Sequence, residues 1–206
     1  MKYTLFIMLL LTAKLTNAEV KLGWEDKNPK NIEWTKITMA AVDRHFQNLD
    51  AALDAELFCP EYTFLDVPTK KHFWGEFISA MAFFESGWSS VSQLTEVTLG
   101  NDSVTGKTVT SEGLLQLSYG DIKWAKWCRF DWEKDQENNP LITSILNPKN
   151  NLECGIGILA NQIRKQHKIV LEKKAYWSIL KINHKFQRID KMRDMIVGRI
   201  PTCIKG

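Results

Sequence analysis

The chain has 206 residues, of which 44% are hydrophobic and 25% charged, and its formal net charge is +3. Ten Phe, eight Trp and four Tyr support a packed interior, and the length suits one domain or a core with a helical extension. After the first 18 residues no segment approaches the roughly 18 consecutive apolar residues of a membrane span. The composition therefore excludes a multi-span membrane protein.

Residues 1–18 have the three parts of a secretory signal. Lys2 carries the charge, residues 5–13 form a short apolar core, and residues 16–18 form a small-residue cleavage site. We predict a mature chain from Glu19 that is periplasmic or secreted, with no stable membrane insertion. No cysteine follows the site, so a lipid anchor is not expected. A retained signal acting as an anchor is the alternative, although its apolar core is short for a spanning helix.

The chain has four cysteines, and an even number in an exported protein favours two disulfides over metal ligands. Their spacing does not resemble a zinc site, and no phosphate loop or dinucleotide fingerprint is present, so we expect no metal and no cofactor. Of the three possible pairings we favour Cys128 with Cys154 and Cys59 with Cys203, which would tie the last segment to the first. Free buried thiols are the alternative.

Charge is distributed unevenly along the chain. Removal of the signal removes Lys2 and Lys14 and lowers the net charge to +1. From Asn161 onward twelve Lys or Arg accompany three acids, whereas residues 19–160 carry thirteen basic and twenty-one acidic residues. The basic region can contact an acidic polymer such as glycan, nucleic acid or anionic lipid, and solvated helix faces explain it equally well.

Hydrophobic periodicity predicts an amphipathic helix over residues 35–57, a loop over residues 60–69, and a second helix that Thr69 caps. After Trp88 the composition changes to Thr, Val, Ser and Gly, which predicts a hairpin or a large loop.

The second half of the chain is also predicted to be helical. A helix capped by Asn150 or Asn151 contains Gly155 and Gly157, which indicate close approach by another backbone or a ligand. Residues 176–182 and 186–197 are predicted to form two more helices. The predicted fold class is mainly α with a small β element.

The second predicted helix carries the first candidate for chemistry. Trp74, Ile78, Met81 and Glu85 lie at i, i+4, i+7 and i+11, which is one face of a helix. Gly87 is a typical helix stop, so Glu85 lies in the last turn, near the negative end of the helix dipole. Burial and the dipole both raise the pKa of a carboxyl group, as a general acid requires. A surface glutamate at a frayed helix end is the alternative.

Three motifs after this point carry a family resemblance. Glu85-Ser86, then Gly113-Leu114-Leu115-Gln116, then Asn151-Leu152 followed by Gly155 and Leu159, resemble in order and spacing the lytic transglycosylase and goose-type lysozyme superfamily. The resemblance covers about residues 74–180. It implies a lysozyme-like, mainly α fold in which a small hairpin or long loop lies beside a glycan cleft. The chain then divides into a signal (1–18), a helical extension (19–67) and a catalytic domain with basic C-terminal helices (68–206).

The resemblance also implies an activity, the cleavage of the β-1,4 bond between N-acetylmuramic acid and N-acetylglucosamine in peptidoglycan. Glu85 would protonate the glycosidic oxygen, and the matching positions imply substrate-binding or supporting roles for Ser86, Gly113, Gln116, Asn151 and Tyr176. The pattern is incomplete at its end, because Tyr176 is followed by Trp177 where the family often has Asn.

Two routes of cleavage are compatible with these residues. A hydrolytic lysozyme needs a second carboxylate, for which Glu96, Asp102 and Glu112 are candidates, with Glu112 the first to test. A lytic transglycosylase, as the family implies, needs none of them, because the substrate's own 6-hydroxyl attacks and leaves a 1,6-anhydro sugar. We give the transglycosylase route a slight preference.

Other classes of function stay open. A non-catalytic lysozyme-like module could bind glycan through the same cleft, and a nucleic-acid or membrane-surface binder could use the basic tail. The leading hypothesis expects peptidoglycan as the partner, no nucleic acid, and a monomer. The large aromatic residues are interpreted as core, with stacking on sugar rings as the alternative; they are Trp74, Trp88, Trp124, Trp127 and Trp132.

Overall fold

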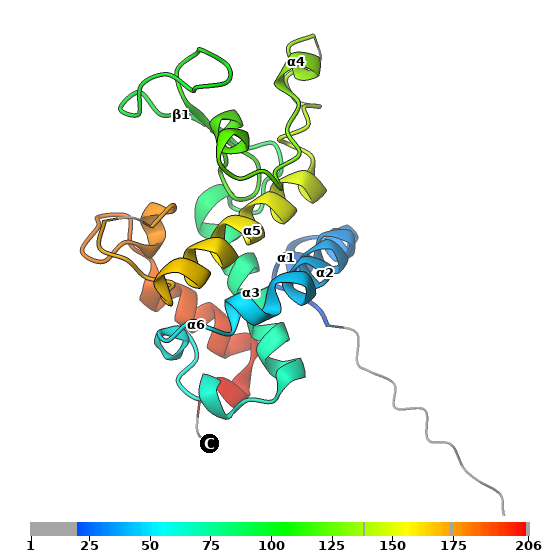
Figure 1. The fold of residues 1–206 in the computed structure, drawn as a ribbon. Coiled ribbons are helices and arrows are strands. Elements are labelled where there is room, and N and C mark those ends of the chain that lie inside the picture. Colours follow the sequence, from blue (N-terminus) through cyan, green and yellow to red (C-terminus); the bar gives the residue numbers. More distant parts are fainter. Residues whose placement is uncertain (1–19, 138, 174, 205–206) are drawn as a thin grey trace, which may run out of the picture.

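The computed structural model describes residues 20–137, 139–173 and 175–204, so the predicted signal lies outside the described residues. In this part of the chain helices dominate, and one two-stranded antiparallel sheet accompanies them, which confirms the predicted fold class (Figure 1). The α-helices are α1 (Trp24–Lys27), α2 (Ile32–Leu49), α3 (Val67–Ser86), α4 (Trp132–Asp135), α5 (Pro148–Gln166) and α6 (Ile189–Arg199). The strands are β1 (Gln93–Thr95) and β2 (Thr110–Glu112). Short 3₁₀ helices cover Pro29–Asn31, Ala55–Leu57, Tyr62–Phe64, Tyr119–Lys123, Ser178–Leu180 and Pro201–Cys203.

Helix α3 is the buried central helix. Every residue from Phe73 to Ala82 is buried, because α2 and α6 both pack against it. Its N-cap is Asp66, whose side chain accepts the backbone N–H of Thr69 at 2.9 Å, so the prediction of Thr69 as the cap was wrong by one turn. At the other end Gly87 has a φ of 60°, the left-handed conformation that stops a helix, as predicted.

Helix α5 crosses the middle of the molecule and packs closely against α2 (Figure 1). It begins one turn earlier than predicted, because the side chain of Asn147 caps it. A Cβ atom at Gly155 would clash with the Leu115 side chain, and one at Gly157 would clash with Trp127. The two glycines therefore do permit close approach, by side chains of the neighbouring segment.

Helix α2 ends at Leu49, eight residues before the predicted end, and Leu53 and Leu57 are exposed. Long-range hydrogen bonds explain why the chain turns away soon after the end of α2. The Asp54 carboxylate accepts the backbone N–H groups of Ile169 and Val170 at 2.8 and 2.9 Å, which holds this segment against the residues that follow α5.

The predicted helix over residues 176–182 is also wrong. Only Ser178–Leu180 forms a 3₁₀ turn, and Leu171 pairs with Lys181 in an isolated parallel bridge. The buried indole of Trp177 donates a hydrogen bond to the Leu115 carbonyl at 2.8 Å, so tertiary contacts override the local pattern here. The last predicted helix is confirmed as α6, although it begins at Ile189.

Two disulfides fasten the fold, Cys59–Cys203 and Cys128–Cys154, and both pairings were predicted. They are consistent with a protein outside the cytosol. A partly buried ion pair adds to them, because Arg199 of α6 donates from Nε to the Glu76 carboxylate of α3 at 2.6 Å. The extension and the rest of the chain share one hydrophobic core. In the described residues no helix has both the length and the apolar character that crossing a membrane requires.

Candidate active site

Glu85 lies in the last turn of α3, where the sequence places it, and its side chain is mostly buried. Its Oε1 atom is buried and has no hydrogen-bond partner within the described structure. Burial is the main cause that raises the pKa of Glu85 to about 7, and the charge of Glu96 adds to it. A carboxyl group with these properties keeps its proton near neutral pH and can donate it.

The alternation of side chains along the hairpin explains why Glu96 is the residue that acts on Glu85. In the register of β1 and β2, Gln93 pairs with Glu112 and Leu94 pairs with Ser111. Successive side chains of a strand point to opposite faces, and the Ser111 hydroxyl lies 3.4 Å from the Glu96 carboxylate. Glu96 therefore shares a face with Ser111, and Glu112 lies on the other face.

The other two candidate carboxylates occupy different environments. Glu112 is buried on the face of the hairpin opposite Ser111, where its Oε2 accepts a hydrogen bond from Gln93 Nε2 at 2.7 Å. Burial raises its pKa, and the nearby acids Asp135 and Asp102 act in the same direction. Asp102 is a turn residue whose carboxylate accepts three backbone N–H groups. Of the three predicted candidates, Glu96 alone acts on the pKa of Glu85.

The Gly113–Gln116 turn is fixed by Asn151. Gly113 has a φ of 77°, and a Cβ atom there would clash with the Asn151 side chain. The Asn151 amide is fully buried, accepts the Leu115 N–H at 2.9 Å, and donates to the carbonyls of Glu112 and Ile145. Asn151 thus orients this turn through the interior and has no exposed atoms with which to contact a sugar.

Two further predicted residues make local contacts. The Gln116 side chain donates to the Gly113 carbonyl at 2.9 Å, and Gln116 itself has a φ of 49°, so its amide folds back onto the turn. The Ser86 hydroxyl donates to the Ala82 carbonyl and accepts the Ser89 N–H. Ser86 therefore stabilises the end of α3, directly beside Glu85.

Tyr176 is positioned by a residue that sequence reasoning missed. Its hydroxyl donates to the Asp121 carboxylate at 2.5 Å, across 55 residues of sequence. Burial and the charge of Asp121 raise the pKa of Tyr176, and the charge of Glu85 contributes in the same direction, which places Tyr176 near the candidate acid. Ser118 and Asp121 form a capping box that is visible in the sequence. That motif indicates only the local turn and not the bond to Tyr176.

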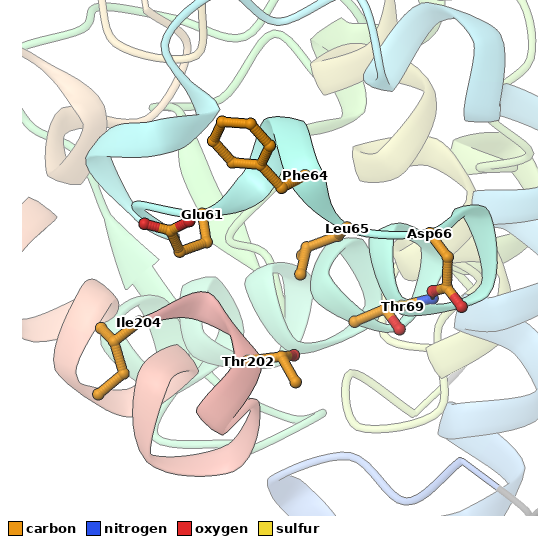
Figure 2. Close-up of a pocket in the computed structure, with 7 residues that line it drawn as sticks. All are labelled: Glu61, Phe64, Leu65, Asp66, Thr69, Thr202 and Ile204. Carbon is orange, nitrogen blue, oxygen red and sulfur yellow. The ribbon is translucent and has the colours of Figure 1, made fainter. Parts of the chain in front are cut away.

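The surface has cavities both far from and near these residues. One of about 550 Å³ lies between the start of α3 and the C-terminal segment, with Thr69 and Thr202 in its lining (Figure 2). Thr69 is sixteen residues from Glu85 along α3, or about 24 Å at 1.5 Å per residue, so this cavity is remote from the candidate acid. A second, of about 280 Å³, lies on the Glu112 face of the hairpin, with Trp132 also in its lining.

The third cavity lies beside Tyr176 and measures about 310 Å³. Its lining residues are Trp124, Ile158, Asn161, Gln162, Lys165, Gln166, Leu171 and Tyr176. Tyr176, which lines this cavity, is also a residue whose pKa the charge of Glu85 helps to raise. The described residues contain no group of three or more His, Cys, Asp or Glu that could hold a metal ion.

A scan against protein-family models finds no match, and a search of curated proteins finds none either. Among solved structures, the wild-type form 2 of Bd0314 DslA is 28% identical, with a TM-score of 0.72, and the match covers 91% of this chain and all of that one. Two glutamate-to-glutamine mutants of the same protein match at 27% identity with TM-scores of 0.73 and 0.72. The two substituted positions are eleven residues apart in that protein.

Proposed function

We propose that this chain is an exported glycosidase that cuts the glycan strands of peptidoglycan between N-acetylmuramic acid and N-acetylglucosamine. The observation that carries the proposal is Glu85, a mostly buried carboxyl group with a pKa of about 7 and an unpaired Oε1 atom. The identity of the proposed substrate comes from the ordered motifs, which resemble those of the lytic transglycosylase and goose-type lysozyme superfamily. The predicted signal and the two disulfides support the periplasm or the exterior of the cell as its compartment.

The comparison with Bd0314 DslA supports the choice of residues. Glu85 and Glu96 are eleven residues apart, and no other two glutamates of this chain have that spacing. The two substituted glutamates of the similar protein have the same separation. We therefore infer that Glu85 and Glu96 are the corresponding pair.

This pair changes the balance between the two routes. A lytic transglycosylase requires one acid, whereas hydrolysis uses two carboxyl groups on either side of the scissile bond. The interaction of Glu96 with Glu85 favours the hydrolytic route, that of a lysozyme, over the transglycosylase route that the motifs alone favour. Glu96 also replaces Glu112 as the second carboxylate to test first.

In the proposed reaction, protonated Glu85 donates its proton to the glycosidic oxygen as the bond to the anomeric carbon breaks. Glu96 then either removes a proton from the attacking water or attacks the anomeric carbon itself, to be released by water in a second step. In both cases water supplies the hydroxyl group of the new reducing end. Tyr176, held by Asp121, would border the sugar beside Glu85.

The test is the mass spectrometry of fragments that the mature protein releases from purified peptidoglycan. Hydrolysis gives reducing termini, and the transglycosylase route gives 1,6-anhydro termini. The variant Glu85→Gln keeps the size of the side chain and removes the acid, so it should release no fragments. Unchanged release by this variant would overturn the assignment of Glu85, and binding of peptidoglycan without release by the wild type would favour the non-catalytic module.

A further inference from the structure

A loop after α5 projects from the body of the molecule. Residues 175–188 lie between α5 and α6, and Figure 1 shows them as part of an orange loop that stands out beside these helices. Backbone hydrogen bonds close the loop at its base, because the Leu171 N–H donates to the Leu180 carbonyl and the Ile182 N–H donates to the Leu171 carbonyl. The loop tip, residues 181–186, is therefore anchored to the rest of the fold.

The loop tip carries two exposed apolar side chains. Ile182 is 42% exposed and Phe186 is 48% exposed. The Phe186 ring is held in place by its neighbours, because the His184 ring lies 5.5 Å from it between centroids and the Lys185 ammonium lies 4.8 Å from its centroid. A single exposed apolar residue needs no partner. Two of them on one projecting tip present apolar surface that a partner could remove from water.

Basic side chains surround this tip in the sequence. Residues 164–188 contain eight Lys or Arg and one acid, Glu172, which gives this stretch a net charge of +7. Of these eight cations the structure describes seven, and none of the seven takes part in an ion pair. Two of them, Lys181 and Lys185, directly precede Ile182 and Phe186. An anionic partner would relieve the repulsion among these charges.

The combination of apolar and basic groups discriminates between anionic partners. A nucleic acid attracts the lysines through its phosphates, but it offers Ile182 no apolar surface. A membrane with anionic lipids offers both kinds of contact, since head groups attract Lys and Arg and hydrocarbon lies directly beneath them. The long lysine side chains can reach the head groups while the apolar side chains enter the layer below.

We propose that the loop tip docks on an anionic lipid surface. Ile182 and Phe186 enter the boundary between the head groups and the acyl chains, and Lys181 and Lys185 contact the anionic head groups. This binding is peripheral and reversible, because two apolar side chains and a basic surface do not span the bilayer. It does not depend on the proposed cleavage of glycan, to which it adds a place of action.

The experiment is sedimentation of the mature protein with vesicles. One set mixes phosphatidylglycerol with phosphatidylcholine, and the other contains phosphatidylcholine alone. The wild type should bind the mixed vesicles far more tightly, and added salt should weaken this binding. The double variant Ile182→Ser/Phe186→Ser should bind the mixed vesicles at least about tenfold more weakly. Lys181→Glu/Lys185→Glu should lose at least about thirtyfold.

The matched control is Leu141→Ser/Ile142→Ser. These two apolar residues are 57% and 74% exposed in the segment after α4, outside the basic stretch, so their replacement should leave vesicle binding unchanged. Equal binding by the two double serine variants would overturn the proposal, as would failure of the wild type to bind the mixed vesicles.

Duplex DNA is the competing probe. Tight binding of DNA that Ile182→Ser/Phe186→Ser retains, together with weaker binding of vesicles, would assign the basic surface to a nucleic acid and reject the lipid. Purified peptidoglycan contains no membrane, so the loop variants should release fragments from it at the wild-type rate. A protein that binds vesicles and releases no fragments would refute the proposed function alone, and the reverse result would refute the docking site alone.

Discussion

The charge of Glu96 acts on Glu85 across the start of the hairpin and helps to keep the Glu85 carboxyl protonated. Burial is the larger cause of the raised pKa of Glu85 and the charge of Glu96 adds to it, so the Glu85 carboxyl keeps its proton near neutral pH. In the proposed reaction Glu85 therefore acts as the acid and Glu96 as the second carboxyl group.

The first prediction separates Glu96 from Glu112. Glu96→Gln should lower the release of fragments from peptidoglycan at least about a hundredfold, because it removes the second carboxylate. Glu112→Gln should change the rate by less than about threefold, because Glu112 lies on the opposite face of the hairpin from Glu96 and does not act on the pKa of Glu85. Initial rates of fragment release by the two variants provide the check. A larger loss from Glu112→Gln than from Glu96→Gln would refute this assignment.

The second prediction concerns pH. Only protonated Glu85 can act as the acid, so the cleavage rate should fall as the pH rises through about 7, the pKa of Glu85. Replacing Glu96 by Gln removes a charge that raises this pKa, so the pKa should move down. Carbon-13 NMR titration of the labelled Glu85 carboxyl in both proteins measures this directly, without reliance on activity. An unchanged Glu85 titration in Glu96→Gln would show that the two groups do not interact.

The third prediction is that replacing the Glu85 carboxyl group raises the free energy of unfolding. The folded-state pKa of Glu85 is about 7 against an ordinary 4.5. The folded state therefore binds more protons than the unfolded state between these values, and stability falls as the pH rises from 4.5 to 7. At about 1.4 kcal/mol per pKa unit, with allowance for partial exposure, Glu85→Gln should stabilise the fold by roughly 1–3 kcal/mol above pH 7.

Urea unfolding at pH 5 and at pH 8 tests this linkage. The gain of Glu85→Gln over wild type should be larger at pH 8, since the wild-type carboxyl must be ionised there. Equal differences at the two pH values would contradict the raised pKa of Glu85.

The fourth prediction concerns the turn that Asn151 holds. Asn151→Ala removes three buried hydrogen bonds and should destabilise the fold by about 2–4 kcal/mol in urea unfolding. Its neighbour is the control: Asn150 makes one side-chain bond, to the Ser144 carbonyl, so Asn150→Ala should cost about 1 kcal/mol. Similar losses in both variants would show that Asn151 does not fix the turn.

The fifth prediction compares the two disulfides. Cys59–Cys203 closes 144 residues and Cys128–Cys154 closes 26. In the chain-entropy description these loops correspond to about 5 and about 3.5 kcal/mol of stabilisation, respectively. Replacing each pair by Ser and comparing urea midpoints should show the larger loss for Cys59–Cys203. The reverse order would mean that local packing, not chain entropy, determines their contributions.

The sequence predicts Glu85 well, because its place depends on local rules. Helical periodicity and the glycine stop fix both the face and the last turn of α3, and the structure agrees. The choice between Glu96 and Glu112 depends on the register of the hairpin, since a shift by one residue exchanges the two faces. Neither loop residue carries a local signal that reveals this register.

Long-range contacts explain the other differences. Residues 176–182 are apolar, but the hydrogen bond from Trp177 to Leu115 holds them out of a helix. Helix α2 ends early where Asp54 binds the backbone after α5. Asp121 has a visible capping motif, yet its partner Tyr176 is 55 residues away and could not be paired with it from the sequence.

The Cys59–Cys203 disulfide closes most of the described chain into a covalent ring. A single cut of the backbone anywhere between these cysteines would therefore leave one connected molecule instead of two fragments. If a protease made such a cut, the nicked molecule would keep Glu85 and its surroundings together. The same bond that ties the C-terminal segment to the first half of the chain thus protects the assembly of the candidate site against the loss of a piece.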